Sequence, residues 1–89
     1  MKTEFRKSFV RDIKRLGKDE KLLGRIKNII LEVEAADSIV AIANLKKLKA
    51  EGCYYRIRSG NYRLGLIIQN NAVIFVRALH RSEIYRFFP

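Results

Sequence analysis

The chain has 89 residues, enough for one small domain with a modest hydrophobic core but not for two. Hydrophobic residues make up 48% of it, which excludes a disordered chain, and no apolar run approaches the length of a membrane span. Nineteen lysines and arginines face nine acidic residues, a net charge of +10, and the excess lies in residues 46–89, which hold nine basic and two acidic residues. This charge balance favours the interpretation that the protein binds a polyanion, over the alternative that it is basic without having such a partner.

The single cysteine and the single histidine exclude two kinds of site. Cys53 cannot form a disulfide within the chain, which is typical of a protein in a reducing compartment. Together with His80 it cannot assemble a zinc site of Cys and His ligands. The first five residues lack the apolar stretch of a signal peptide. We therefore expect a cytoplasmic protein that needs no metal ion or other cofactor.

The N-terminal third predicts a short strand followed by two helices. Residues 2–6 alternate enough for an edge strand, and Ser8 is a plausible N-cap for a helix that runs to about Leu16. Gly17 ends that helix, and Asp19 can cap the next one. In the second helix, apolar residues recur at three- and four-residue intervals: Leu22, Leu23, Ile26, Ile29, Ile30 and Val33. Its opposite face, with Lys21, Arg25, Lys27 and Glu32, is interpreted as a solvated surface.

The middle of the chain is harder to assign. Residues 39–42 fit either a short helix or a buried strand, and both remain open. Lysines then surround Leu48, the one apolar anchor of residues 46–49, and Glu51-Gly52 predicts a turn.

Residues 54–63 are the clearest motif. On an extended backbone Tyr54, Arg56 and Arg58 share one face, and residues 59–61 tolerate the positive φ of a tight turn. A second strand over 62–69 is apolar on both faces apart from Arg63, as expected for a central strand.

Asn70-Asn71 predicts another tight turn, into a strand over residues 72–79. Residues 83–88 fit either one helical turn or a tail packed on the sheet. The order of elements predicts one α+β domain over residues 1–89, with an N-terminal helical hairpin packed on a small, mainly antiparallel sheet.

The predicted topology brings two basic segments together. Adjacent antiparallel strands run in opposite directions, so His80 and Arg81 are expected beside Arg63 and the turn at 59–61. Arginine binds phosphate bidentately, and an RNA strand brings its own nucleophile, the ribose 2′-hydroxyl. Such a patch suits RNA cleavage without a metal, with further RNA contacts expected from Lys46, Lys47, Lys49, Tyr54, Arg58 and Arg77.

The ordered set Tyr-Arg-Ile-Arg (55–58), Gly-Asn-Tyr-Arg (60–63) and His-Arg-x-x-x-Tyr (80–85), after two helices, resembles the RelE/ParE toxin superfamily, specifically its RelE-like mRNA interferase branch. The resemblance spans nearly the whole chain. It implies a toxin of a type II toxin–antitoxin system that cleaves mRNA in the ribosomal A site. It also implies neutralisation by a cognate antitoxin, which we expect to be acidic.

The resemblance also implies roles for individual residues. Arg63 matches the arginine that contacts the scissile phosphate, and Arg56 the basic position before it. His80 and Arg81 match the basic pair after the last strand, and Tyr85 matches the C-terminal aromatic at the ribose. Lys49 matches the lysine that follows the leucine of the family pattern.

Departures from the family pattern leave the general base open. Some relatives carry a lysine where Tyr54 stands, and some a carboxylate near Lys46, so His80 and Tyr85 are the candidates here. Two alternatives to the mRNA interferase remain: a ParE-like inhibitor of DNA gyrase, and a non-catalytic RNA-binding module.

Overall fold

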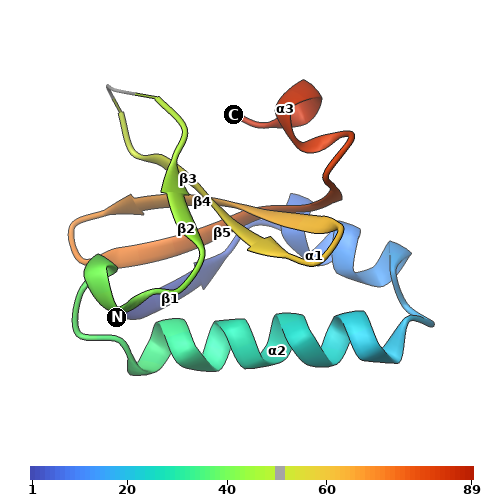
Figure 1. Cartoon of the computed structure of the whole chain (residues 1–89), viewed down its shortest axis with the longest axis horizontal. Coiled ribbons are helices and arrows are strands. Elements are labelled where there is room, and N and C mark those ends of the chain that lie inside the picture. Colours follow the sequence, from blue (N-terminus) through green and yellow to red (C-terminus); the bar gives the residue numbers. More distant parts are fainter. Residues whose placement is uncertain (50–51) are drawn as a thin grey trace.

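The computed structural model describes residues 1–49 and 52–89, and its centre is a five-stranded sheet with the order β1-β5-β4-β3-β2 (Figure 1). Only β1 and β5 are parallel neighbours; every other pair is antiparallel. The strands are β1 (Lys2–Phe5), β2 (Leu45–Lys47), β3 (Tyr54–Ser59), β4 (Tyr62–Gln69) and β5 (Ala72–His80), and the helices are α1 (Lys7–Arg15), α2 (Glu20–Ala35) and α3 (Ile84–Phe87). The predicted α+β class, with a helical hairpin on a mainly antiparallel sheet, is confirmed.

The start of α1 differs from the prediction. Its N-cap is Arg6, and Ser8 lies one residue inside the helix, where its hydroxyl donates to the carbonyl of Val76 in β5 at 2.6 Å. Ser8 therefore ties the helix to the sheet instead of capping it. The carboxylate of Asp19 does cap α2, accepting from the Leu22 amide at 3.1 Å, as predicted.

The segment between α2 and β3 holds two features that the sequence left open or missed. Residues Ile39–Ala41 form a single 3-10 turn, so the undecided stretch is helical. Leu45–Lys47 then pairs with β3 as an edge strand that the sequence did not predict, because three residues are too few for a periodicity to show. The predicted turn at Glu51-Gly52 falls partly outside the described residues; Gly52 has a φ of +93°.

Both predicted hairpins are present. Gly60 supplies the positive φ at the β3–β4 turn, with neither Ser59 nor Asn61 needing it, and Asn70 and Asn71 both adopt positive φ at the β4–β5 turn. β4 lies at the centre of the sheet, as its two apolar faces predicted.

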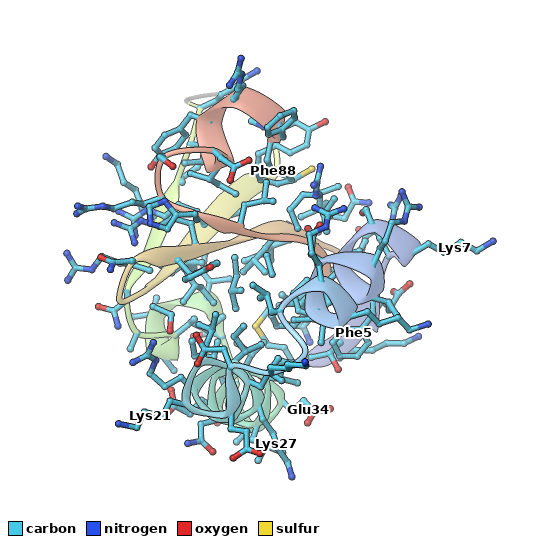
Figure 2. All side chains as sticks on the ribbon, turned by 90° about the vertical axis from the view of Figure 1, so that its right-hand side faces the viewer. Phe5, Lys7, Lys21, Lys27, Glu34 and Phe88 are labelled. Atoms are coloured by element: carbon cyan, nitrogen blue, oxygen red, sulfur yellow. The ribbon has the colours of Figure 1, made fainter. Side chains whose placement is uncertain are left out.

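The sheet has a hydrophobic cluster on each face. The larger one joins α1 and α2 to the sheet and buries residues from all three, among them Phe9, Leu22, Ile26, Ile57, Leu64 and Phe75. The smaller one, with Leu79, Ile84 and Phe88, fixes α3 to the opposite face, where Tyr54 also packs. The C-terminal segment is thus a short helix, and Figure 2 shows the two helical layers on either side of the sheet.

Candidate nucleic-acid cleavage site

Two arginines face each other across β3 and β4. Arg58 and Arg63 are register partners, so their side chains leave the sheet side by side on the face opposite α2. In the same way Lys46 of β2 is the partner of Arg56 of β3. Like charges directly opposite each other destabilise a sheet, and this arrangement is therefore suited to hold an anion.

Arg56 is held by the loop that enters β2. Its Nη1 donates to the carbonyl of Asn44 at 2.9 Å, and the Arg58 amide donates to the same oxygen at 3.3 Å. Asn44 itself has a φ of +60°. The Nε of Arg56 is buried and has no hydrogen-bond partner within the described chain. The bond to Asn44 therefore fixes the position of the Arg56 guanidinium, and its Nε remains an unpaired donor within the described chain.

Arg63 is oriented by the β3–β4 turn. Its Nη1 donates to the carbonyls of Gly60 and Tyr62, both at 2.9 Å. Partial burial lowers the pKa of Arg63, and the neighbouring charges of Arg56, Arg58 and Arg81 lower it further, while Tyr85 opposes them. Arg63 therefore lies within electrostatic range of the other three guanidinium groups, and we refer to Arg56, Arg58, Arg63 and Arg81 as the arginine cluster.

The C-terminal segment brings Arg81 and Tyr85 to this cluster. The Arg81 amide donates to the Asn61 carbonyl at 2.7 Å, which joins the end of β5 to the β3–β4 turn as the topology predicted. Tyr85 is 62% exposed on α3, and its hydroxyl is close enough to Arg63 to affect the pKa of that arginine. An exposed phenol hydroxyl thus lies within electrostatic range of Arg63.

His80 belongs to the other side of the sheet. It is the register partner of Tyr62, whose ring lies edge-on 5.5 Å from the imidazole, and both border a small cavity next to α1. The Ser82 amide donates to Nδ1 at 3.1 Å, and the Ser82 hydroxyl lies 2.8 Å from the same nitrogen. His80 therefore lies near Arg63 in the sheet without sharing its face, and Ser82 holds its ring at Nδ1.

Four other predicted RNA contacts lie on different faces of the sheet. Lys46 joins Arg56, whereas Lys47, the partner of Tyr55, points to the opposite side. Lys49 lies over the ring of Tyr54 at 5.9 Å, and that ring packs edge-on against Phe88 at 5.8 Å. Tyr54 is therefore an element of the smaller hydrophobic cluster, with Lys49 at its outer surface.

Arg77 has a structural partner. Its Nε donates to Asp12 at 2.8 Å and its Nη2 donates to the other carboxylate oxygen at 3.2 Å. The hydrogen bond from Arg77 to Asp12 raises the pKa of the arginine, and Asp12, only 3% exposed, also accepts from the Ala78 amide at 2.9 Å. This bidentate pair joins α1 to β5, so the structure separates Arg77 from the arginine cluster.

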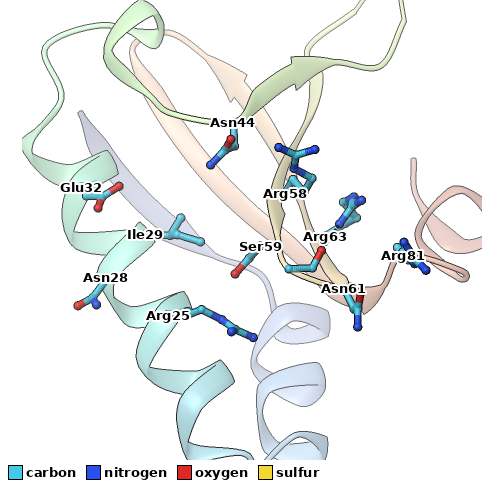
Figure 3. Close-up of a pocket in the computed structure, with 11 residues that line it drawn as sticks. Arg25, Asn28, Ile29, Glu32, Asn44, Arg58, Ser59, Asn61, Arg63 and Arg81 are labelled. Carbon is cyan, nitrogen blue, oxygen red and sulfur yellow. Dashed lines mark hydrogen bonds between the residues drawn. The ribbon is translucent and has the colours of Figure 1, made fainter.

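The structure adds two residues of α2 to the site: Arg25, which sequence reasoning assigned to a solvated helix surface, and Asn28, which it did not single out. Arg25 and Asn28 of α2 border an open depression of about 730 Å³, together with Asn61, Arg58, Arg63 and Arg81 (Figure 3). We call this hollow the turn depression. The sequence carried a signal for a polar face at this position, because the spacing of Arg25, Asn28 and Glu32 places them along one side of a helix.

Two features, a metal-binding group of side chains and a membrane-spanning helix, are absent from the residues that the structure describes. Residues 1–49 and 52–89 contain no group of three or more His, Cys, Asp and Glu side chains arranged to hold a metal ion. In the same part of the chain, no helix has both the length and the apolar character that crossing a membrane requires.

Comparison with known proteins identifies the family. The model of the family described as ParE toxin of type II toxin-antitoxin system, parDE, matches residues 3–85. Toxin RelE3 of Methanocaldococcus jannaschii is 44% identical over 91 residues, a match that covers the whole of both chains. The chain belongs to the RelE/ParE toxin superfamily.

Solved structures of this superfamily share the fold. The toxin–antitoxin complex RelB–RelE from Methanococcus jannaschii matches with a TM-score of 0.79 at 41% identity, covering 97% of this chain and 99% of the other. The Escherichia coli DinJ–YafQ complex (TM-score 0.75, 14% identity, 93% and 94% coverage) and the Staphylococcus aureus YoeB dimer (0.71, 18%, 90% and 95%) match in fold. The superfamily predicted from the hairpin and tail motifs is thereby confirmed.

Proposed function

We propose that this RelE/ParE toxin is a ribosome-dependent endoribonuclease that cleaves mRNA in the A site and so stops translation in the cytoplasm. The observation that carries the proposal is the pairing of Arg58 with Arg63, with Arg56 and Arg81 close by and Tyr85 exposed beside them. Repulsion between these guanidinium groups is relieved when a phosphodiester lies among them. The 44% identity to Toxin RelE3 supports the role of a toxin.

The proposed reaction uses a nucleophile from the RNA. The ribose 2′-hydroxyl loses its proton and its oxygen bonds to the adjacent phosphorus, while the bond from phosphorus to the 5′-oxygen breaks. The 5′-oxygen takes up a proton as it leaves. The products are a 2′,3′-cyclic phosphate and a 5′-hydroxyl, so water is not consumed in this step, and the proposed mechanism assigns no part of it to a metal ion.

The position of each residue determines the role that it is assigned in this reaction. Arg56, Arg63 and Arg81 stabilise the negative charge that builds on the phosphate oxygens. Tyr85, an exposed hydroxyl beside Arg63, is assigned the proton transfer at the ribose. His80, with Nδ1 engaged by Ser82, is assigned to the turn that holds Arg81 in register.

The proposal is tested with purified toxin and translating ribosomes. We expect cuts in the A-site codon, 2′,3′-cyclic and 5′-hydroxyl ends, and the same rate with EDTA added at a level that leaves the ribosomes intact. An mRNA with a 2′-deoxyribose at the cut position is the matched control and should stay whole. Ends carrying a 5′-phosphate, or cleavage of the deoxy substrate, would refute the mechanism. RNA binding without any cut would instead support the non-catalytic module.

Inhibition of DNA gyrase is the second candidate, because the matching family model is that of ParE. The arginine cluster with Tyr85 favours the ribonuclease, since a gyrase inhibitor needs no such constellation. A supercoiling assay separates the two functions. Loss of gyrase activity at toxin concentrations that leave translation unaffected would decide for the inhibitor.

A cognate antitoxin is part of the proposal. The groove between α1 and α2, about 590 Å³, is lined by apolar side chains, and exposed Phe5, Val10 and Leu31 border it. Lys14 and Lys27 border it, and no carboxylate from residues 1–49 or 52–89 lines it. An amphipathic helix with acidic flanks fits such a groove. The RelB–RelE and DinJ–YafQ complexes support an antitoxin partner, and a small acidic open reading frame beside the gene is expected to encode it.

A further inference from the structure

The turn depression joins the arginine cluster to helix α2. Arg25, Asn28 and Glu32 border it from α2, spaced at intervals of three, four and seven residues, and Figure 3 shows the Arg25 side chain extending from the helix toward the β3–β4 turn. The guanidinium of Arg25 lies against the turn, since its Nη2 is 3.5 Å from the point where a Cβ on Gly60 would stand. A basic side chain of α2 thus continues the line of cations from Arg63 and Arg81 around the edge of the sheet.

The charges in this depression are strongly unbalanced. Four arginines border it, Arg25, Arg58, Arg63 and Arg81, and among the residues that the structure describes Glu32 is the only carboxylate in its lining. Within residues 1–49 and 52–89, the side chains of Arg25, Arg58 and Arg81 form no ion pair and donate no hydrogen bond. Their donors are therefore available to an anion, in contrast to Arg77, whose donors are occupied by Asp12.

The depression also carries groups that can contact a base. Asn28 and Asn61 border it from opposite sides, one on α2 and one in the turn, and both are exposed. Each amide offers donors and an acceptor, the combination that pairs with the edge of an unstacked base. A guanidinium beside two amides matches a nucleotide better than it matches a free anion.

We infer that the turn depression binds the nucleotide next to the scissile one on the same RNA strand, with Arg25 on its phosphate and Asn28 and Asn61 beside its base. This inference rests on the proposed ribonuclease function. A strand whose scissile phosphate lies at Arg63 and Arg81 continues into the depression, because these two arginines border both sites. Arg25 is then an RNA-binding residue outside the catalytic group, and it determines how firmly the strand is held.

The test compares Arg25→Gln with Lys27→Gln. Both remove one positive charge from an exposed position of α2 at little change in helix propensity, but Lys27 borders the apolar groove on the other side of the helix. The probes are short RNAs with a 2′-deoxyribose at the scissile position: a dinucleoside monophosphate, which holds only the scissile phosphate, and a hexanucleotide. Affinity is measured by NMR titration at several salt concentrations.

For the hexanucleotide we expect Arg25→Gln to weaken binding roughly tenfold, and to reduce the slope of log K against log salt by about 0.7, the value for one phosphate contact on a single strand. The dinucleoside monophosphate should bind the variant as it binds the unchanged protein. Arg25→Lys should restore the slope, which a merely structural role for Arg25 would not predict. Lys27→Gln should give a smaller change in affinity that is the same for both probes.

Different results would overturn the nucleotide subsite and the proposed ribonuclease function. Equal hexanucleotide binding by Arg25→Gln and Lys27→Gln overturns the subsite, even if the toxin cleaves mRNA as proposed. A toxin that cleaves no RNA, but whose hexanucleotide binding depends on Arg25 as described, retains the subsite and loses the catalytic assignment. An Arg25→Gln variant that loses only affinity for the antitoxin shows that a protein segment occupies the depression, and this also overturns the inference.

Discussion

The pairing of Arg58 with Arg63 makes the candidate site favourable for binding an anion. Register partners on one face of a sheet stand close together, and two guanidinium groups in this position repel unless an anion lies between them. Arg63 has its Nη1 on two turn carbonyls, which orients it without neutralising its charge. Arg63 is therefore oriented in the absence of a bound anion.

Arg63→Ala is expected to lower the cleavage rate on translating ribosomes by about 10²–10³, because one preorganised contact to the charged phosphate is lost. Arg11→Ala is the control, since Arg11 is exposed on α1 away from the arginine cluster. The measurement is the rate of A-site cleavage under single-turnover conditions. Full activity of folded Arg63→Ala would remove Arg63 from the site.

Tyr85 and His80 are distinguished by conservative variants. Tyr85→Phe deletes only the hydroxyl beside Arg63, and the cleavage rate should fall by about 10² or more. His80→Asn keeps an acceptor near the position of Nδ1 for the Ser82 amide, so the rate should change by less than about tenfold. Single-turnover cleavage of the same mRNA measures both. If His80→Asn loses as much activity as Tyr85→Phe while remaining folded, the proton-transfer role belongs to the histidine.

At the level of secondary-structure elements, α3 depends on a glycine in β4. A Cβ on Gly65 would lie 2.8 Å from two atoms of the Phe88 ring, so this ring packs directly on the backbone of the strand. Phe88 in turn contacts Tyr54 and shares the smaller hydrophobic cluster with Ile84. The position of Tyr85 on α3 therefore depends on this close contact.

Gly65→Ala should expel the Phe88 ring and move α3 away from the arginine cluster. We expect the free energy of unfolding to fall by about 1–3 kcal/mol, as for an overpacked core, and cleavage to fall with it at temperatures where the sheet is still folded. Denaturant unfolding and the cleavage assay measure the two effects. Phe88→Leu in the same chain should recover part of both. Unchanged cleavage by Gly65→Ala alone would show that α3 does not need this contact.

The bidentate pair of Asp12 and Arg77 holds α1 on β5. Asp12→Asn keeps the volume but leaves Arg77 without its counter-charge and the Ala78 amide with a poorer acceptor. We expect the free energy of unfolding to fall by about 3 kcal/mol, the lower end for a broken buried pair, because Arg77 is 23% exposed. Urea unfolding checks this, with the exposed Asp37→Asn as control. A loss no larger than that of the control would make the pair a surface contact.

On the scale of the whole molecule, two surfaces lie on different sides of the sheet and helices. The arginine cluster lies on the face that carries α3, and the apolar groove lies between α1 and α2. An inhibitor docked in the groove is therefore separable from RNA bound at the cluster. We therefore expect a mutation in the groove to change antitoxin binding without changing RNA cleavage.

Leu31→Glu is expected to weaken binding of the acidic antitoxin at least tenfold, because it adds a like charge to the rim of the groove and removes an apolar contact. Cleavage by the free toxin should not change. Val40→Glu is the matched control, since Val40 is 92% exposed and does not line the groove. Isothermal titration with the protein encoded beside the toxin gene measures the affinity. Equal affinities for both variants would show that the antitoxin binds elsewhere.

Local patterns predicted the elements well where they were long or carried strong turn residues. The period of α2, the cap at Asp19, Gly60 in one turn and Asn70-Asn71 in the other all appear in the structure. The misses involve contacts between distant segments. Ser8 bonds to Val76, and β2 is defined only by its pairing with β3. Neither contact leaves a periodicity in the chain.

The helical hairpin, the strands from Tyr54 to Leu79, the excess of positive charge and the family could be predicted from the amino-acid sequence, because period, turn residues and motif order are local properties. Which basic residues lie together depends on the folded chain. It keeps Arg77 with Asp12, turns His80 towards Tyr62 and brings Arg25 to the β3–β4 turn. The physical reason is that register, the bulge beside Gly65 and helix packing select the face on which a side chain lies, and a change of one residue in register reverses that face.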